Sequence, residues 1–186
     1  MHLLHSRASL GRLGDPAPDD ATLQRCFQAA LRAPDHGLLH PYRFHLVRGE
    51  ARAALGDLLA SAYKARTPDA TPEMVEQQSK KALRAPLIIV VSALIKDHPK
   101  VPPIEQILCA GAAAQNILLA LHAQGFAGIW RTGPLAYDER VKAGFGLEPK
   151  DALVGFIYAG TAQADAPSFE RPSVSDHLQE WGGPQT

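Results

Sequence analysis

The stretch Gly125–Pro134 contains the residues of this sequence best suited to hold a small polar ligand. It reads as a strand that enters a turn, and it ends in Arg131, Thr132 and Gly133 before the proline. Backbone N–H groups left free at such a turn, next to a cationic side chain, can hold an anion or a polar heterocycle. On this segment alone, an ordinary glycine-rich turn is the alternative.

A second group of polar side chains surrounds two prolines. Arg32 and His36 flank Pro34, and His40 precedes Pro41. Two histidines four residues apart are reminiscent of helical zinc motifs, but the prolines place them in a loop, and no third ligand stands at a suitable spacing. We therefore expect no metal, and we interpret His36 as a ligand-contacting side chain on a loop.

Near the N-terminus, Arg7 and Ser9 flank Ala8. An arginine and a serine at this spacing can grip a phosphate through charge-assisted hydrogen bonds, although solvated surface arginines are common. The sequence contains no nucleophile elbow, no Walker loop and no dinucleotide fingerprint. Gly125 and Gly128 lack the third glycine of that fingerprint and follow a helix.

Length and composition limit the classes of function. The 186 residues suit one domain with a substantial core, so we expect a single domain over residues 1–186. Lys plus Arg equals Asp plus Glu at 19 each, without the basic excess of a general nucleic-acid binder or a membrane-surface protein. The longest strongly apolar stretch, Leu87–Ile95, is shorter than the roughly 20 residues of a membrane span.

The cysteines and the N-terminus favour a cytoplasmic protein. Cys26 and Cys109 each stand among apolar residues in helical patterns, which is typical of buried structural thiols rather than of a disulfide. The N-terminus lacks the apolar core of a signal peptide. We therefore expect a cytoplasmic location.

The elements that position these residues follow from hydrophobic periodicity and from the prolines and glycines. Apolar residues between Leu23 and Leu31 recur at spacings of three and four, and Pro34 ends this helix near Arg32. Leu87–Ile95 is apolar throughout, which indicates a strand covered on both faces. The other expected elements are a strand around 44–46, helices at 51–64, 73–83, 104–124 and 137–145, strands at 125–130 and 152–159, and an irregular tail from Ala162.

The helix expected over 104–124 carries a run of small residues, Ala110–Ala114. Helix propensity explains the alanines, but Gly111 costs about 1 kcal/mol relative to alanine. We therefore expect this helix to pack closely, in the core or at a dimer interface. Helices on both sides of a small sheet predict an α/β or α+β fold with three layers.

Taken in chain order, these segments resemble the nitroreductase family and, within it, the small YdjA-like group. The matching segments are Arg7-x-Ser9, Leu31 to His36, Pro41-Tyr42-x-Phe44, Arg84 to Ile89, Lys100 to Pro102, Gln124 to Gly133, Val154 to Phe156 and Gly160-Thr161. Each is weak alone, but their order from about Leu3 to Thr161 makes coincidence improbable. The resemblance implies an α+β fold, a three-layer α/β/α sandwich with a mixed central sheet flanked by helices, in a homodimer.

The resemblance further implies FMN, held at the interface between two subunits. By this likeness, Arg7, Ala8 and Ser9 contact the phosphate and ribityl end, Arg32 and His36 complete the pocket, and Arg131, Thr132 and Gly133 line the isoalloxazine with a backbone N–H near N5. Leu121, His122, Ala123, Gln124, Gly125 and Phe126 match a stretch linked to nicotinamide binding.

The activity implied is that of an FMN-dependent oxidoreductase. NAD(P)H donates electrons to a nitroaromatic, quinone or related small-molecule acceptor by a ping-pong mechanism, and no nucleophilic side chain is indispensable because the flavin performs the redox step. The alternatives are a flavin-binding protein that stores, senses or delivers FMN with little turnover, and a small-molecule module without flavin.

Three residues depart from the family pattern. Ala8 stands where the family usually repeats arginine, and we expect weaker phosphate binding there. His40 replaces a common glutamine and Tyr42 the usual tryptophan, so we expect a different acceptor preference. The physiological acceptor, the choice of NADH or NADPH and the role of helix 73–83 as a lid stay open.

Overall fold

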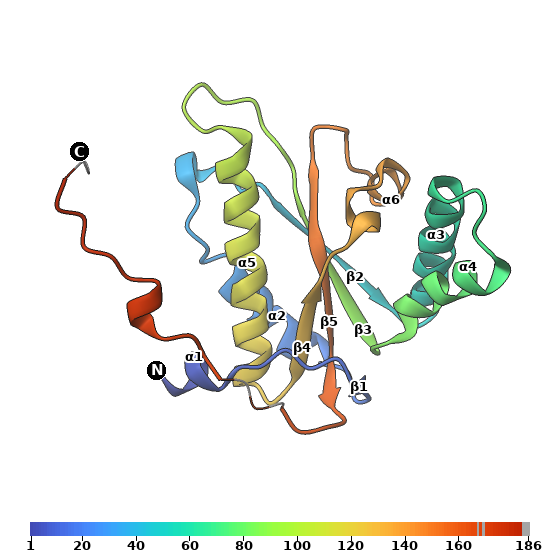
Figure 1. Cartoon of the computed structure of the whole chain (residues 1–186), viewed down its shortest axis with the longest axis horizontal. Helices are drawn as coiled ribbons and strands as arrows, with labels where there is room; N and C mark the ends of the chain where they lie inside the picture. The colour runs from blue at the N-terminus through green and yellow to red at the C-terminus, as the bar shows by residue number, and fades with distance from the viewer. Residues whose placement is uncertain (167, 169, 184–186) are drawn as a thin grey trace.

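The computed structural model describes residues 1–166, 168 and 170–183. Five strands form one sheet in the order β1-β5-β3-β2, and β4 also pairs with β5 (Figure 1). Their bounds are β1 Leu13–Gly14, β2 Tyr42–Arg48, β3 Leu87–Ala93, β4 Ala127–Arg131 and β5 Ala152–Ala162. The long β5 is therefore the common partner of β1, β3 and β4.

The direction of the strands corrects one expectation. All four strand pairs found in the described residues are antiparallel, whereas a mixed sheet was expected. Parallel pairing is limited there to an isolated bridge between Ser9 and Gly128. The connection between β2 and β3 explains the antiparallel pairing. The helical segment after β2 begins and ends at the same end of the sheet, where Arg48 pairs with Leu87.

Helices cover both faces of the sheet. α2 (Asp20–Ala30) and α5 (Pro103–Ala123) pack on one face, and α3 (Ala51–Arg66) and α6 (Glu139–Gly144) on the other (Figure 1). α4 (Pro72–Ser79) packs against α3, and the short α1 (His2–Ser6) contacts α5. The 3₁₀ helices are η1 His36–Leu38, η2 Lys80–Leu83, η3 Pro134–Tyr137 and η4 Val174–Asp176. The three-layer α/β/α arrangement is confirmed.

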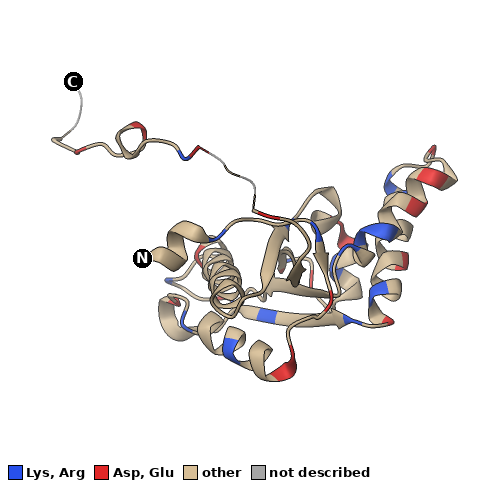
Figure 2. Cartoon of the chain, turned by 90° about the horizontal axis from the view of Figure 1, so that it is seen from below, with Lys and Arg blue, Asp and Glu red and all other residues tan. Residues whose placement is uncertain are grey.

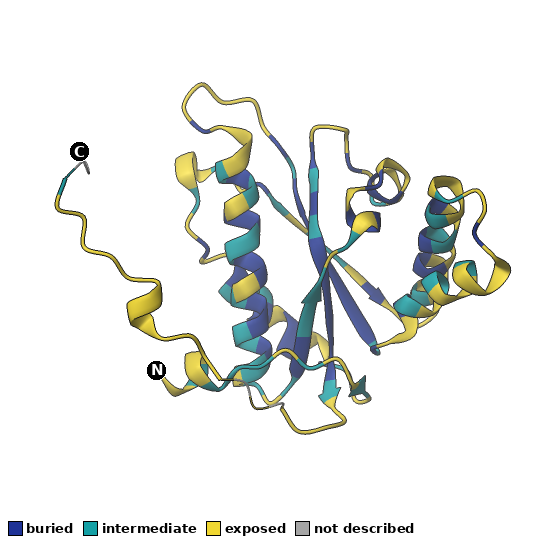
Figure 3. Cartoon of the chain, in the orientation of Figure 1, coloured by how far each residue is buried: buried dark blue, intermediate teal, exposed yellow. Residues whose placement is uncertain are grey.

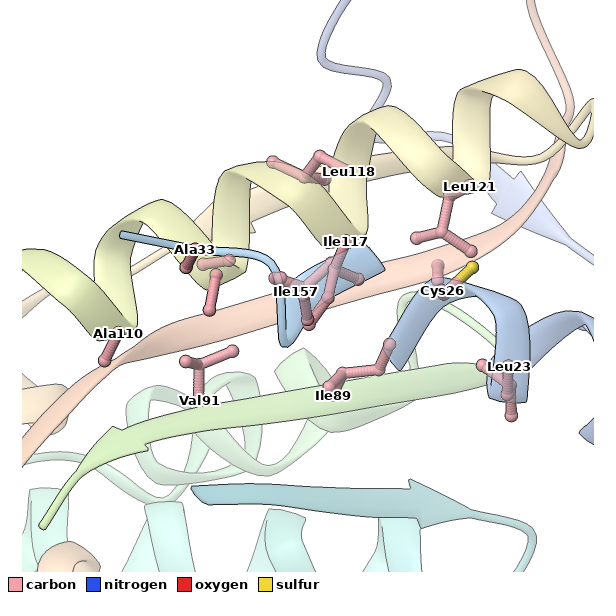
Figure 4. Packing of buried hydrophobic residues seen from close by; sticks show 14 of the residues in the cluster. Leu23, Cys26, Ala33, Ile89, Val91, Ala110, Ile117, Leu118, Leu121 and Ile157 are labelled. Carbon is pink, nitrogen blue, oxygen red and sulfur yellow. The ribbon is translucent and has the colours of Figure 1, made fainter. Parts of the chain in front are cut away.

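β3 shows how the sequence produces these layers. All seven of its residues are buried. Ile89 and Val91 belong to the apolar cluster beneath α2 and α5 (Figure 4), and Ile88 and Val90 to the cluster beneath α3. Successive side chains of a strand point to opposite faces, so an uninterrupted apolar run covers both faces of the sheet, as the sequence predicts.

α5 is the central helix of its layer. Ala110 is fully buried in the core (Figure 4), as is Ala113, which confirms the close packing expected of this helix. At Gly111 the packing is looser, since an added Cβ would lie 3.7 Å from the Trp130 ring, an ordinary contact distance. Among the described residues, α5 is also the one helix long and apolar enough to cross a membrane, a test that the core helix of a globular protein passes as well.

Two helices expected as continuous are broken. Residues 73–83 divide into α4 and η2, and residues 137–145 into η3 and α6. Asp138 explains the second break, because its backbone is extended and its side chain caps α6 by accepting from Arg140 N at 2.9 Å. The sequence does not predict α1, β1 or η1, because elements of two to five residues leave no periodic pattern.

Beyond β5, the described tail runs away from the sheet and contains only η4 (Figures 1 and 2). Most of the described tail is exposed (Figure 3). Its exposed residues include Val174, Leu178 and Trp181, the last with 83% of its surface exposed. The irregular tail agrees with the sequence, and it presents large apolar side chains to solvent.

Candidate functional site

A cavity of about 630 Å³ opens where β4 ends. Leu59, Leu135 and Phe156 supply apolar lining. The polar lining consists of Tyr63, Arg66, Thr67, Gln78, Lys81, Arg84, Arg131, Thr132 and Tyr158. The volume of the cavity lies within the range of small-molecule sites, about 300–1,000 Å³. The cavity thus joins the turn predicted from the sequence to residues of α3, η2 and β5.

Four cationic side chains line this cavity, and Arg66 is paired with Asp138. The other three, Lys81, Arg84 and Arg131, have no carboxylate partner in the part of the chain that the structure describes. The Arg131 guanidinium carbon lies 6.0 Å from the centre of the Tyr158 ring. Burial, and then the charges of the two arginines, lower the pKa of Lys81. Burial raises the pKa of Tyr158, and the same arginines oppose that shift. Unpaired cations in a partly buried cavity favour an anionic ligand, because the ligand relieves their repulsion.

The turn after β4 offers free backbone amides. Neither Thr132 N–H nor Gly133 N–H donates a backbone hydrogen bond to a described residue. Gly133 has a φ of +106°, which glycine adopts readily, and Pro134 then begins η3. No atom lies within 4 Å of a Cβ placed on Gly133, so a ligand can approach the backbone closely. These amides can donate to a carbonyl oxygen or a ring nitrogen, as the predicted role requires.

The N-terminal segment runs beside the start of β4. Ser9 bridges to Gly128, and Arg7 Nη1 donates to Ser9 Oγ at 3.5 Å, so the predicted phosphate pair is together. A strand rises about 3.3 Å per residue, so this pair is roughly 10 Å from the cavity end of β4. The Arg131 side chain spans part of that distance, since its Nη2 lies 3.0 Å from the place of a Cβ on Gly11.

Within one chain, Arg32 and His36 do not reach the cavity. They follow α2, which covers the opposite face of the sheet. Both are exposed, and His36 Nδ1 lies 3.2 Å from Glu105 Oε2 in the first turn of α5. Their exposure leaves them available to a second copy of the chain, as the predicted shared site requires.

The segment expected to bind nicotinamide ends α5 and makes structural contacts. Leu121 is fully buried, and Gln124 Nε2 donates to Cys26 Sγ at 3.2 Å. His122 and Phe126 line a hollow of about 50 Å³ together with Arg7 and Ala8. Gly125 has a φ of +81° where the helix ends, and Ala123 is exposed. Nicotinamide binding by this segment stays a prediction. Leu121 is excluded from it, because a fully buried side chain cannot contact the ligand.

The sequence match decides the family. The model of the nitroreductase family matches residues 6–161. The chain belongs to the nitroreductase family. YdjA of Escherichia coli K12, provisionally named an NAD(P)H nitroreductase, is 39% identical over 166 residues, which cover 89% of this chain and 90% of YdjA. A Haemophilus influenzae protein with the same provisional name is 37% identical over 165 residues, or 88% and 89% of the two chains.

Solved structures share the nitroreductase fold. A nitroreductase-like protein of Bacillus cereus superposes with a TM-score of 0.83 at 23% identity, covering 98% of this chain and 95% of the other. A Desulfovibrio desulfuricans protein, solved in complex with FMN, gives a TM-score of 0.71 at 24% identity over 98% and 96% of the chains. At these identities the likeness establishes the fold.

Sequence reasoning missed part of the cavity of this nitroreductase. Lys81, whose Nζ hydrogen-bonds to Gln78 Oε1, lies in the segment 73–83 that was expected only as a polar helix. Arg84 begins the segment Arg84 to Ile89 that matches the family, but no ligand contact was predicted for it. The basic run from Lys80 to Arg84 is the signal that could have found them. Among the described residues, no group of three or more His, Cys, Asp or Glu side chains could hold a metal ion.

Proposed function

We propose that the chain is an FMN-dependent oxidoreductase that transfers electrons from NAD(P)H to nitroaromatic, quinone or related acceptors by a ping-pong mechanism. The observation that carries this proposal is the cavity at the end of β4, where three cations without a carboxylate partner among the described residues, Lys81, Arg84 and Arg131, meet the amides of Thr132 and Gly133. Membership of the nitroreductase family supports it, as do the names of the Escherichia coli and Haemophilus influenzae relatives and the FMN in the Desulfovibrio desulfuricans structure.

The cavity residues suit the ring of FMN, and the N-terminal segment beside β4 offers donors for its phosphate. Arg7 and Ser9 supply donors for the phosphate, and the apolar lining formed by Leu59, Leu135 and Phe156 suits a flat ring and excludes water from it. Bound FMN supplies two-electron redox chemistry.

The polar groups of the cavity then act on the ring. The amides of Thr132 and Gly133 orient it by donating to its polar edge. Lys81 and Arg84 offset negative charge that reduction adds, in a site where their own charges are unpaired. No side chain of this set has to act as a nucleophile.

We further propose the assembly and setting in which this site works. Two copies form a homodimer, and Arg32 and His36 of each copy complete the flavin site of the other, which their exposure permits. Residues 1–186 form one FMN-binding domain, supported by the single sheet of the described residues. The partner is a small-molecule acceptor in the cytoplasm rather than a nucleic acid or a membrane, which the zero net charge supports.

The visible spectrum of the purified protein tests this function. After FMN is added and free FMN is removed by gel filtration, we expect flavin absorbance to co-elute with the protein. Oxidation of NADPH or NADH with a quinone acceptor should then follow at steady state. Bound flavin without turnover would instead support a storage or delivery protein, and a colourless protein that FMN does not stabilise thermally would overturn the flavin assignment.

A further inference from the structure

Arg66 joins the two walls of the cavity. It is the last residue of α3, and its Nη1 donates to the carbonyl oxygen of Pro134 at 3.2 Å. The same nitrogen lies 3.7 Å from Asp138 Oδ2, a carboxylate whose side chain is 6% exposed and which also caps α6. One guanidinium thus holds the first residue of η3 and the residue that follows η3.

In η3, Leu135 and Ala136 are buried in the apolar cluster beneath α3, and Arg66 supplies the polar link between this turn and the rest of the fold. In the described part of the chain, Arg66 is the one side chain from outside η3 and α6 that hydrogen-bonds or pairs with residues 132–138. Gly133 accepts from Ala136 N at 2.9 Å, which closes the turn on itself but does not fix it to the sheet. Gly133 is also the most permissive residue type for backbone rotation. The position of its N–H therefore depends on the polar contact that holds Pro134 as well as on the burial of Leu135 and Ala136.

We propose that Arg66 is a positioning residue that sets where the Thr132 and Gly133 amides lie against a bound flavin, and through them how strongly the protein prefers reduced over oxidised flavin. This inference rests on the proposed function. A hydrogen bond from a fixed amide strengthens as negative charge develops on its acceptor. An amide that drifts loses more of its interaction with the reduced ring than with the oxidised one.

The chemistry of the side chain supports arginine rather than lysine at this position. A guanidinium presents several donors in a planar fork and can serve a carbonyl and a carboxylate together, whereas an ammonium is a single point charge on a flexible stem. Arg66→Lys should therefore keep one of the two contacts and give an intermediate phenotype. Arg66→Gln should lose both contacts.

The test compares the dissociation constants of oxidised FMN and of dithionite-reduced FMN for each protein. For Arg66→Gln we expect the preference for reduced FMN to fall roughly tenfold, the value of one well-placed hydrogen bond to a charged acceptor, and for Arg66→Lys an intermediate fall. Lys64→Gln is the matched control, since Lys64 also lies near the end of α3 and donates to two carbonyls, those of Pro68 and Ala70, away from the cavity. It should leave the preference unchanged.

The outcomes separate three cases. A merely structural Arg66 predicts that both affinities and the melting temperature fall together while the preference stays at the wild-type value, and this result would overturn the inference. If Arg66→Gln does not fold, the preference measured for Arg66→Lys decides in the same way. A wild-type protein that binds neither form of FMN would instead refute the proposed function, and the inference with it.

Discussion

At the residue scale, Gly11 leaves the space that the Arg131 side chain fills. A Cβ at position 11 would lie 3.0 Å from Arg131 Nη2, so a branched side chain there must displace the guanidinium. We predict that Gly11→Val and Arg131→Gln each weaken FMN binding about tenfold, because both remove the same charge-assisted hydrogen bond from the ligand. The double variant should bind no more weakly than either single variant. Quenching of FMN fluorescence measures all three affinities.

A second glycine provides the control for that pair. Gly182 has no atom within 4 Å of an added Cβ, so Gly182→Val should leave FMN affinity unchanged. If the losses of Gly11→Val and Arg131→Gln add in the double variant, the two residues act independently and the coupling is wrong.

Cys109 connects burial to the pH dependence of stability. It is a free, buried thiol, and burial, followed by the charge of Asp35, raises its pKa to about 11. The unfolded thiol has a pKa of about 8.5, so the unfolded chain loses its proton first. The contribution of Cys109 to the free energy of unfolding is therefore fully present below about pH 8.5, and it is lost as the pH rises toward the pKa of the folded state.

We predict that Cys109→Ala makes the alkaline decline in the free energy of unfolding shallower than in wild type, even if the variant is less stable at pH 8. Urea unfolding at pH 8, 9 and 10 measures this slope. A residual slope should persist, because burial also raises the pKa of Cys26, Tyr42 and Tyr158. Equal slopes for variant and wild type would contradict the assignment to Cys109.

The candidate site could be predicted where it is local in sequence. Arg131 ends β4, and Thr132 and Gly133 follow it directly, so the pattern of that segment alone located them. Lys81 and Arg84 come much earlier in the chain, and they reach the same cavity only because α3 and η2 pack on one face of the sheet. No local pattern encodes that approach.

At the element scale, β4 and β5 meet at a glycine. Trp130 Nε1 donates to Val154 O at 3.2 Å, and a Cβ on the adjacent Gly155 would lie 2.1 Å from that nitrogen and 2.9 Å from Arg131 O. Gly155→Ala should therefore destabilise the fold by about 1–3 kcal/mol or more through overpacking. The melting temperature followed by circular dichroism should fall by roughly 4–10 °C.

Gly111→Ala is the matched control, because Gly111 faces the same tryptophan from α5 at an ordinary contact distance. There alanine should be neutral or stabilise the helix by up to about 1 kcal/mol. A Gly155→Ala protein as stable as wild type would show that Trp130 can move away without cost, against the geometry described.

Elements were predictable where one pattern is long. The apolar run predicted β3 and most of its bounds, and the long helical pattern did the same for the 21-residue α5. The direction of the strands was not predictable. The sequence of a helical connection does not reveal whether the next strand begins at the end of the sheet where the previous strand stopped or at the opposite end. Here Arg48 pairs with Leu87, which makes β2 and β3 antiparallel.

At the scale of the whole molecule, large apolar side chains remain exposed on one helix and on the tail. Ile104 and Leu108 lie one turn apart on α5, and Leu108 is 63% exposed. Val174, Leu178 and Trp181 of the tail are exposed as well (Figure 3). Contiguous exposed apolar patches mark protein interfaces, whereas single exposed apolar residues are common on any surface. The neighbouring Ile104 and Leu108 are therefore the surface that we assign to the proposed homodimer, in which the exposed Arg32 and His36 remain accessible to the second copy.

We predict that wild-type protein sediments as a dimer and that Leu108→Glu raises the dimer dissociation constant by roughly a hundredfold or more, the cost of burying an unpaired carboxylate in an interface. FMN affinity should fall in parallel, because a monomer lacks the arginine and histidine that the second copy contributes. Met74→Glu is the control, since Met74 is also an exposed apolar residue but lies on α4 in the opposite layer. Sedimentation equilibrium and FMN titration on the same samples measure both effects. A wild-type monomer that binds FMN as tightly as any dimer would show that each chain holds a complete flavin site by itself.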